Sequence, residues 1–145
     1  IHNDAERAIA ACGEIVQSFR QLQRKWARVL ADDVRPGVGC GVATGRVFLG
    51  NIGTPNRIEY TLIGDGVNLA SRLCSQAQDG MVIASELAYE KSKRLYEVIE
   101  WPAIQIKGKA EPQRVFQVMN LKPGVTPVTA VEDSGSRQAA LSSSR

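Results

Sequence analysis

Asn68 and Arg72 are polar side chains four residues apart, in a segment whose pattern predicts a helix. Residues at this spacing share one helical face. An amide can orient a ligand oxygen, and a guanidinium can hold a phosphoryl group through planar, charge-assisted hydrogen bonds. The apolar stripe predicted for this helix comprises other positions: Val67, Ala70, Leu73 and Cys74. The pair therefore suits an anionic substrate, although the two residues taken alone are more typical of a solvated helix surface.

The elements that would position this pair are predicted between residues 37 and 73. Two β-segments are expected, joined by a tight turn at Gly45-Arg46 and followed by a loop and a short strand at residues 60–63. The helix would begin at residues 64–66, with Asp65 in a capping role.

The first of these β-segments has one face that is nearly bare backbone. Side chains alternate between the two faces of a strand, and this alternation places Gly39, Gly41 and Ala43 together. Because glycine inside a strand marks the close approach of another part of the chain, we expect an element to pack tightly against this face.

The remaining sequence predicts an α+β domain followed by a tail. Apolar residues at three- and four-residue spacing predict a long helix over residues 3–31. Four further elements are expected: a buried strand at 81–84, a helix capped by Ser85 and reaching about residue 93, a strand pair at 96–101 and 103–107 interrupted by Pro102, and a closing strand at 114–119. Residues 122–145 are rich in Pro, Thr, Ser and Ala and are expected to form a disordered tail or linker.

Composition narrows the classes of function. The net charge of +3 is too small to indicate a nucleic-acid partner. No apolar run approaches the ~18 residues that a membrane helix needs. Cys12, Cys40 and Cys74 each fall on a predicted apolar face and are interpreted as reduced core residues of a cytoplasmic protein.

Two glycine-rich nucleotide-binding patterns fail on their own spacing. In a dinucleotide-binding pattern that starts at Gly39, the third glycine is replaced by Thr44. In a phosphate-binding loop that starts at Gly45, Asn51 and Ile52 stand where Lys and Ser or Thr are required. Neither pattern is therefore retained.

Three blocks of sequence carry a family resemblance. They are GVATGRVFLGNIG at residues 41–53, EYTLIGDGVNLASRL at 59–73 and IKGKAEPQRVFQV at 106–118. In this order and spacing, residues 1–121 resemble part of the catalytic domain of class III nucleotide cyclases, specifically bacterial adenylate cyclases. The resemblance implies an α+β fold with a ferredoxin-like βαββαβ arrangement that lacks its first strands.

The resemblance also implies a reaction and the residues that perform it. The ribose 3′-hydroxyl of ATP would attack the α-phosphorus, giving 3′,5′-cyclic AMP and pyrophosphate. Asn68 and Arg72 match the family residues that stabilise this transition state, and Lys107 matches a lysine that binds the β- and γ-phosphates. Thr61 matches the position that reads the base, where Thr favours ATP and Cys is usual in guanylate cyclases.

The metal-binding part of the family pattern has no counterpart in this sequence. The resemblance implies two Mg²⁺ or Mn²⁺ ions held by aspartates of an N-terminal part, and an active site formed between two cyclase domains in a homodimer. This chain alone is therefore expected to be inactive, or to complement a domain that supplies the metals. Two alternatives remain open: a non-catalytic dimerisation or regulatory module, and a guanylate cyclase.

Overall fold

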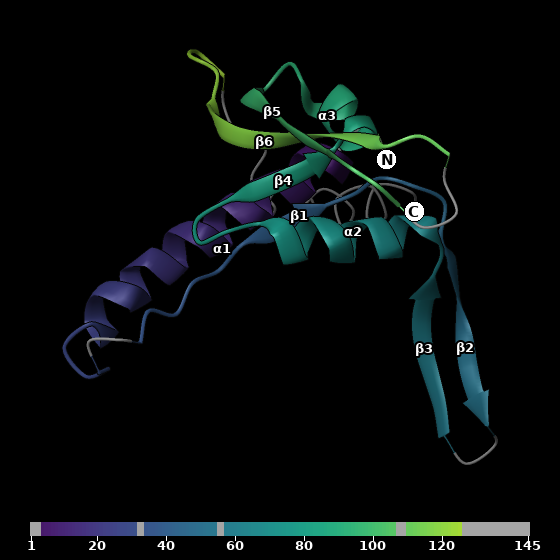
Figure 1. Cartoon of the computed structure of the whole chain (residues 1–145), viewed down its shortest axis with the longest axis horizontal. Coiled ribbons are helices and arrows are strands. Elements are labelled where there is room, and N and C mark those ends of the chain that lie inside the picture. The colour runs from purple at the N-terminus through teal and green to yellow at the C-terminus, as the bar shows by residue number, and fades with distance from the viewer. Residues whose placement is uncertain (1–3, 32–33, 55–56, 107–109, 126–145) are drawn as a thin grey trace, which may run out of the picture.

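The computed structural model describes residues 4–31, 34–54, 57–106 and 110–125, which form three helices and two sheets (Figure 1). In chain order the elements are α1 (Asp4–Trp26), β1 (Cys40–Val42), β2 (Phe48–Thr54), β3 (Arg57–Ile63), α2 (Asp65–Gln76), β4 (Val82–Ser85), α3 (Glu86–Ser92), β5 (Tyr96–Ile104) and β6 (Gln113–Leu121). The strands of the larger sheet lie in the order β1-β4-β6-β5, and β2 and β3 form a separate two-stranded sheet. The predicted α+β class is confirmed. Residues 107–109 and 126–145, with Lys107 and most of the predicted tail, lie outside the described part.

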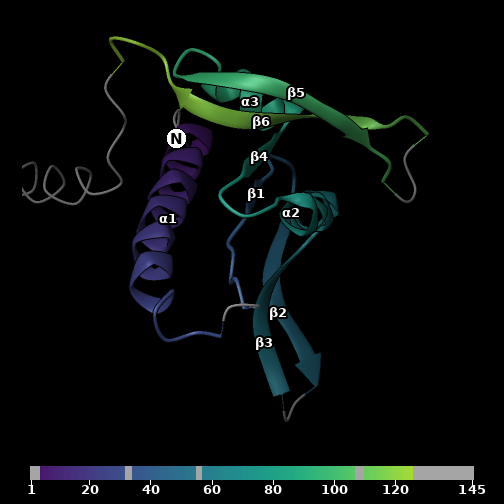
Figure 2. The same ribbon diagram turned by 60° about the vertical axis from the view of Figure 1, so that its left-hand side comes forward.

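The larger sheet separates two apolar clusters. Within β4, Val82 and Ala84 pack with α1 and α3 on one face, whereas Ile83 packs with α2 on the other. Figure 2 shows α1 and α2 on opposite sides of β1 and β4. β4 is buried along its whole length because it lies inside the sheet, parallel to β1 and antiparallel to β6. The predicted cap of α3 is confirmed, since the Ser85 hydroxyl accepts a hydrogen bond from the Ala88 amide.

Helix α1 is shorter than its apolar spacing predicts. Acidic residues in its first turn and basic residues in its last turn interact favourably with the helix dipole. Ile9 and Val16 are buried against the sheet. Beyond Trp26 the chain closes a turn instead, with the amides of Val29 and Leu30 donating to the Trp26 carbonyl. Val29 is 73% exposed, so it makes no buried contact that would hold further helix in place.

The bare face of β1 is covered by α2, as the sequence predicts. A methyl group at Gly41 would lie 2.7 Å from the carbonyl oxygen of Ala70 and closer still to the amide nitrogen of Cys74. A methyl group at Gly39 would lie 2.8 Å from the Ala77 side chain. Real Cβ atoms do not tolerate such separations, so the two glycines allow the backbones of β1 and α2 to touch.

The predicted turn at Gly45-Arg46 does not join a hairpin. β1 pairs with β4 in the larger sheet, and β2 pairs with β3 in the smaller one. Residues 43–47 instead carry the chain past the start of α2, where Gly45 approaches Gly66, and the Thr44 amide donates to the Ser85 hydroxyl. The turn residues fit a hairpin locally, but the partner of β1 is chosen by long-range packing.

The predicted strand pair around Pro102 is also wrong. β5 runs continuously from Tyr96 to Ile104 along β6, and its register with β6 shifts between Trp101 and Ile104. Proline lacks an amide donor, and a sheet accepts it at an edge strand or an irregularity. β5 is the edge strand of this sheet, so Pro102 interrupts the ladder without ending the strand.

We expect Gly41→Ala to lower the free energy of unfolding by about 1–3 kcal/mol, because the new methyl group forces β1 and α2 apart. Gly13→Ala is the matched control. Gly13 lies in the exposed part of α1 with no atom within 4 Å of the added methyl group, and alanine there should stabilise the helix by about 0.5–1 kcal/mol. Denaturant titration of the three proteins checks this, and equal effects of both substitutions would contradict the close packing.

Candidate functional site

The site predicted from the sequence is carried by α2. Leu69 and Leu73 are buried in the cluster beneath this helix, whereas Asn68 and Arg72 are exposed on a different face. The predicted separation of the polar pair from an apolar stripe is therefore confirmed. The membership of that stripe is partly wrong, because Cys74 is exposed and Leu69, which the prediction omitted, is buried.

The start of α2 depends on Gly64. This residue is the N-cap, with φ 148° and ψ 172°, a conformation that residues with a side chain rarely adopt. An added methyl group would also lie 2.9 Å from the Arg46 carbonyl oxygen. The predicted capping role of Asp65 is wrong, since α2 has no side-chain cap and Asp65 is its first residue. A carboxylate at this position still interacts favourably with the positive end of the helix dipole.

Arg72 reaches from α2 to the end of β5. Its Nη1 donates to the carbonyl oxygen of Gln105 at 3.2 Å. The next residue, Ile106, is buried in the same cluster as Leu69 and Leu73, which fixes this segment against the helix. The guanidinium therefore lies beside the segment that leads into residue 107, although Lys107 is itself outside the described residues.

Thr61 lies on the β2–β3 hairpin, which projects away from the larger sheet (Figures 1 and 2). It is half-buried, and Gly50 is its partner on β2. The hairpin joins α2 through Gly64, so Thr61 precedes the N-terminal end of the helix whereas Arg72 lies in its C-terminal half. Asn68 and Arg72 thus share one rigid surface, and Thr61 belongs to a different element.

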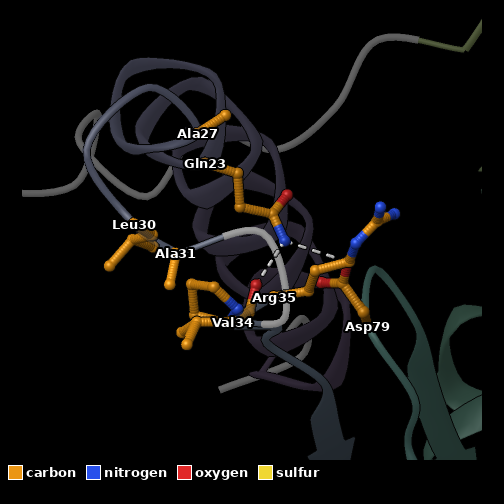
Figure 3. A pocket seen from close by; sticks show the side chains of 8 residues that line it. Gln23, Ala27, Leu30, Ala31, Val34, Arg35 and Asp79 are labelled. Carbon is orange, nitrogen blue, oxygen red and sulfur yellow. Dashed lines mark hydrogen bonds between the residues drawn. The ribbon is translucent and has the colours of Figure 1, made fainter.

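A separate hollow of about 450 Å³ lies at the C-terminal end of α1 (Figure 3). Its lining comprises Gln23, Ala27, Leu30, Ala31, Val34, Arg35, Pro36 and Asp79. Asn68, Arg72 and Thr61 are not among them, so this hollow is separate from the candidate residues.

One wall of the hollow is a hydrogen-bond network around Asp79. Gln23 Nε2 donates to Asp79 Oδ2 at 3.0 Å and to the Pro36 carbonyl at 2.7 Å, and the Val38 amide donates to Asp79 Oδ1 at 3.0 Å. The bond from Gln23, followed by that from Val38, lowers the pKa of the Asp79 carboxyl below 3.8. The network ties the turn after α2 to α1 and to the segment that leads into β1. The sequence pattern around residue 79 gives no indication of this contact.

The implied metal ions find no ligand set in the described residues. Within residues 4–31, 34–54, 57–106 and 110–125, no three His, Cys, Asp or Glu side chains are grouped so as to hold a metal. Cys12, Cys40 and Cys74 are free thiols. Burial, and next the neighbouring Cys40, raise the pKa of the Cys12 thiol to about 12, which disfavours the thiolate that binds metals.

The fold and the position of α2 can be compared with known proteins. Residues 6–120 match the family described as the adenylate and guanylate cyclase catalytic domain. The chain belongs to this family. Among solved structures, this cyclase domain is similar to the adenylyl cyclase CyaB from P. aeruginosa, with a TM-score of 0.75 and 28% identity, over 86% of this chain and 63% of that one. It is also similar to the guanylyl cyclase Cya2, with a TM-score of 0.73 and 26% identity, over 90% of this chain and 65% of that one.

Rat adenylate cyclase type 10 is 38% identical over 89 residues, which are 61% of this chain and 6% of that protein. This chain spans between 4% and 20% of the length of the curated relatives it matches. In the part of this chain that the structure describes, no helix combines the length and the apolar character needed to cross a membrane.

We expect Asp79→Asn to destabilise the chain at about pH 7 and to do so less at about pH 2.5. The folded-state pKa of Asp79 is lowered, so its contribution is present above the unfolded value and is lost as the pH falls through the folded one. Denaturant titrations of both proteins at the two pH values check this. If the difference in unfolding free energy between the two proteins is the same at both pH values, ionised Asp79 does not stabilise the fold.

Proposed function

We propose that the chain contributes the transition-state and substrate-binding residues of an adenylate cyclase that converts ATP to 3′,5′-cyclic AMP and pyrophosphate. The supporting observation is the exposed pair Asn68 and Arg72 on α2, with the Arg72 guanidinium at the end of β5. Similarity to the adenylyl cyclase CyaB and to adenylate cyclase type 10 supports the choice of ATP. Residues 1–121 would form the catalytic part, and residues 122–145 a tail or linker.

The reaction requires compensation of negative charge at the α-phosphorus. As the ribose 3′-oxygen attacks and pyrophosphate departs, charge grows on the phosphoryl oxygens, which a positioned guanidinium stabilises. Arg72 would perform this role, and the Asn68 amide would orient the ribose. Lys107, which follows two residues after Gln105 in the sequence, would hold the β- and γ-phosphates.

Mg²⁺ or Mn²⁺ would polarise the phosphates when bound. The described residues do not fit such ions, because they offer no grouped set of ligands. We propose that the carboxylates come from a second cyclase domain that, unlike the described residues of this chain, carries a grouped set of aspartates. Without them this chain would not turn over ATP.

The β2–β3 hairpin supports a partner domain. Exposed apolar side chains lie on both of its faces, namely Phe48, Leu49, Ile52, Tyr60, Leu62 and Ile63. A two-stranded hairpin is marginally stable by itself, and clustered apolar surface indicates an interaction site. A second cyclase domain is the partner that the family offers.

The free cysteines fit a domain in the reducing environment of the cytoplasm.

A guanylate cyclase is the second candidate. It is favoured by the similarity to Cya2, which nearly equals the similarity to CyaB. A hydroxyl both donates and accepts hydrogen bonds, so Thr61 does not exclude guanine on chemical grounds. ATP is preferred here because Thr61 matches the residue of many bacterial adenylate cyclases.

A complementation assay tests the proposed function. The CyaB catalytic domain would carry Ala at the two positions aligned with Asn68 and Arg72, and would be mixed with this chain, ATP and Mn²⁺. We expect cyclic AMP from the mixture and none from either protein alone. Arg72→Ala in this chain should lower kcat about 100-fold or more with little change in KM. Arg24→Ala, an exposed arginine of α1, is the control and should leave the rate unchanged.

Size-exclusion chromatography of the same mixtures separates the alternatives. A complex that forms but gives no cyclic AMP or cyclic GMP would contradict the enzyme and favour a non-catalytic dimerisation module. A large change in KM with kcat preserved would remove Arg72 from the transition state.

Base selectivity is tested in the same complex. We expect Thr61→Cys to lower the ratio of kcat/KM for ATP over GTP about 10-fold, the equivalent of about one hydrogen bond. Thr61→Ser keeps the hydroxyl and should retain the preference. If neither variant changes the ratio, Thr61 does not contact the base.

A further inference from the structure

One face of the β2–β3 hairpin carries Thr61 together with an exposed aromatic ring. Residues directly opposite each other in an antiparallel pair share a face, as do alternate residues of one strand. Gly50 is opposite Thr61, and Phe48 is two residues before Gly50 and opposite Ile63. Phe48, Gly50 and Thr61 therefore lie on the same face.

The Phe48 ring lies over Gly50. A methyl group at Gly50 would be 3.0 Å from Cε1 of that ring, so glycine is what permits the ring to lie over this position, which is directly opposite Thr61. The ring is nevertheless 68% exposed. The result is an aromatic ring open to solvent, which lies over a position without a side chain and on the same face of the hairpin as Thr61.

We propose that Phe48 is a base-binding residue, on whose ring the purine of the nucleotide stacks while Thr61 contacts the edge of the base. This inference rests on the proposed function, which assigns base recognition to Thr61. Stacking buries the apolar face of a purine and tolerates either base, because every base has a π-face. Phe48 would thus supply affinity for the base, and Thr61 the choice between bases.

The opposite face of the hairpin provides the comparison. Tyr60 pairs with Asn51 and lies on the other face, adjacent in sequence to Thr61. Its exposed fraction is 69%, practically that of Phe48. The two aromatic residues are thus matched in exposure, strand environment and apolar size, and differ in whether they share a face with Thr61.

The first experiment uses the full 145-residue chain with its phenylalanine rings isotopically labelled. The chain has three phenylalanines, Phe19, Phe48 and Phe116, and Phe48→Leu assigns the ring of interest. We expect ATP to shift the Phe48 ring resonances upfield and to leave Phe116, which packs on Tyr89, unchanged. Tripolyphosphate, which lacks a base, should not shift Phe48. The absence of an ATP-dependent shift both in the chain and in its complex with the CyaB domain would overturn the proposal.

The second experiment compares Phe48→Ala, Phe48→Trp and Tyr60→Ala in the reconstituted complex. Phe48→Ala should weaken ATP binding about 5- to 100-fold, the range expected for loss of one stacked base. Binding is measured at protein concentrations that saturate the complex, because Tyr60 also lies on the apolar surface proposed for the partner domain. Phe48→Trp should then retain binding, and Tyr60→Ala should leave it within about 2-fold. Equal effects of the two alanine variants would overturn the proposal.

The outcomes separate this inference from the proposed function. If the wild-type complex makes cyclic AMP but Phe48→Ala binds ATP normally, Phe48 is not a base-binding residue although the cyclase remains. If Phe48→Ala weakens association of the two domains and leaves ATP binding unchanged, the ring is a partner contact. If the wild-type complex binds ATP and Phe48→Ala weakens that binding without any cyclase activity, the base site stands and the proposed enzyme fails.

Discussion

The contact between the backbones of β1 and α2 is the constraint on which the remaining structure depends. Gly39 and Gly41 leave no room for a side chain between the two elements. This contact fixes the depth at which Leu69 and Leu73 enter the core, and with it the direction in which the opposite face of α2 points. Asn68 and Arg72 are exposed on that face because the helix is seated at this depth.

The same constraint explains which parts of the site were predictable from the sequence. Strand alternation places Gly39 and Gly41 on one face, and four-residue helical spacing places Asn68 and Arg72 on another. Both are local rules, and both hold in the structure. The strand that pairs with β1 is set by contacts more than forty residues apart along the chain, which no local pattern records. The turn at Gly45-Arg46 therefore suggested a hairpin that does not form.

The remaining errors also follow from packing that is not local. Cys74 fits an apolar stripe by composition, yet α2 is rotated so that Leu69 is buried and Cys74 is exposed. Asp65 has the residue type of a cap, but Gly64 occupies the cap position, with a φ of 148° that residues with a side chain rarely adopt. The network around Asp79 joins three segments, and a single aspartate in a turn gives no sign of it.

The two ends of the proposed nucleotide site differ in how they are held. The phosphate end is exposed but attached to the core, because Arg72 donates a hydrogen bond to the Gln105 carbonyl and the next residue, Ile106, is buried beneath α2. The base end lies on a hairpin that joins this core through Gly64 and leaves apolar side chains exposed on both faces. A two-stranded hairpin of this kind gains its stability from what covers it. Residues that contact the phosphates should therefore be positioned by this chain itself, whereas the geometry of base recognition should depend on the domain that packs against the hairpin.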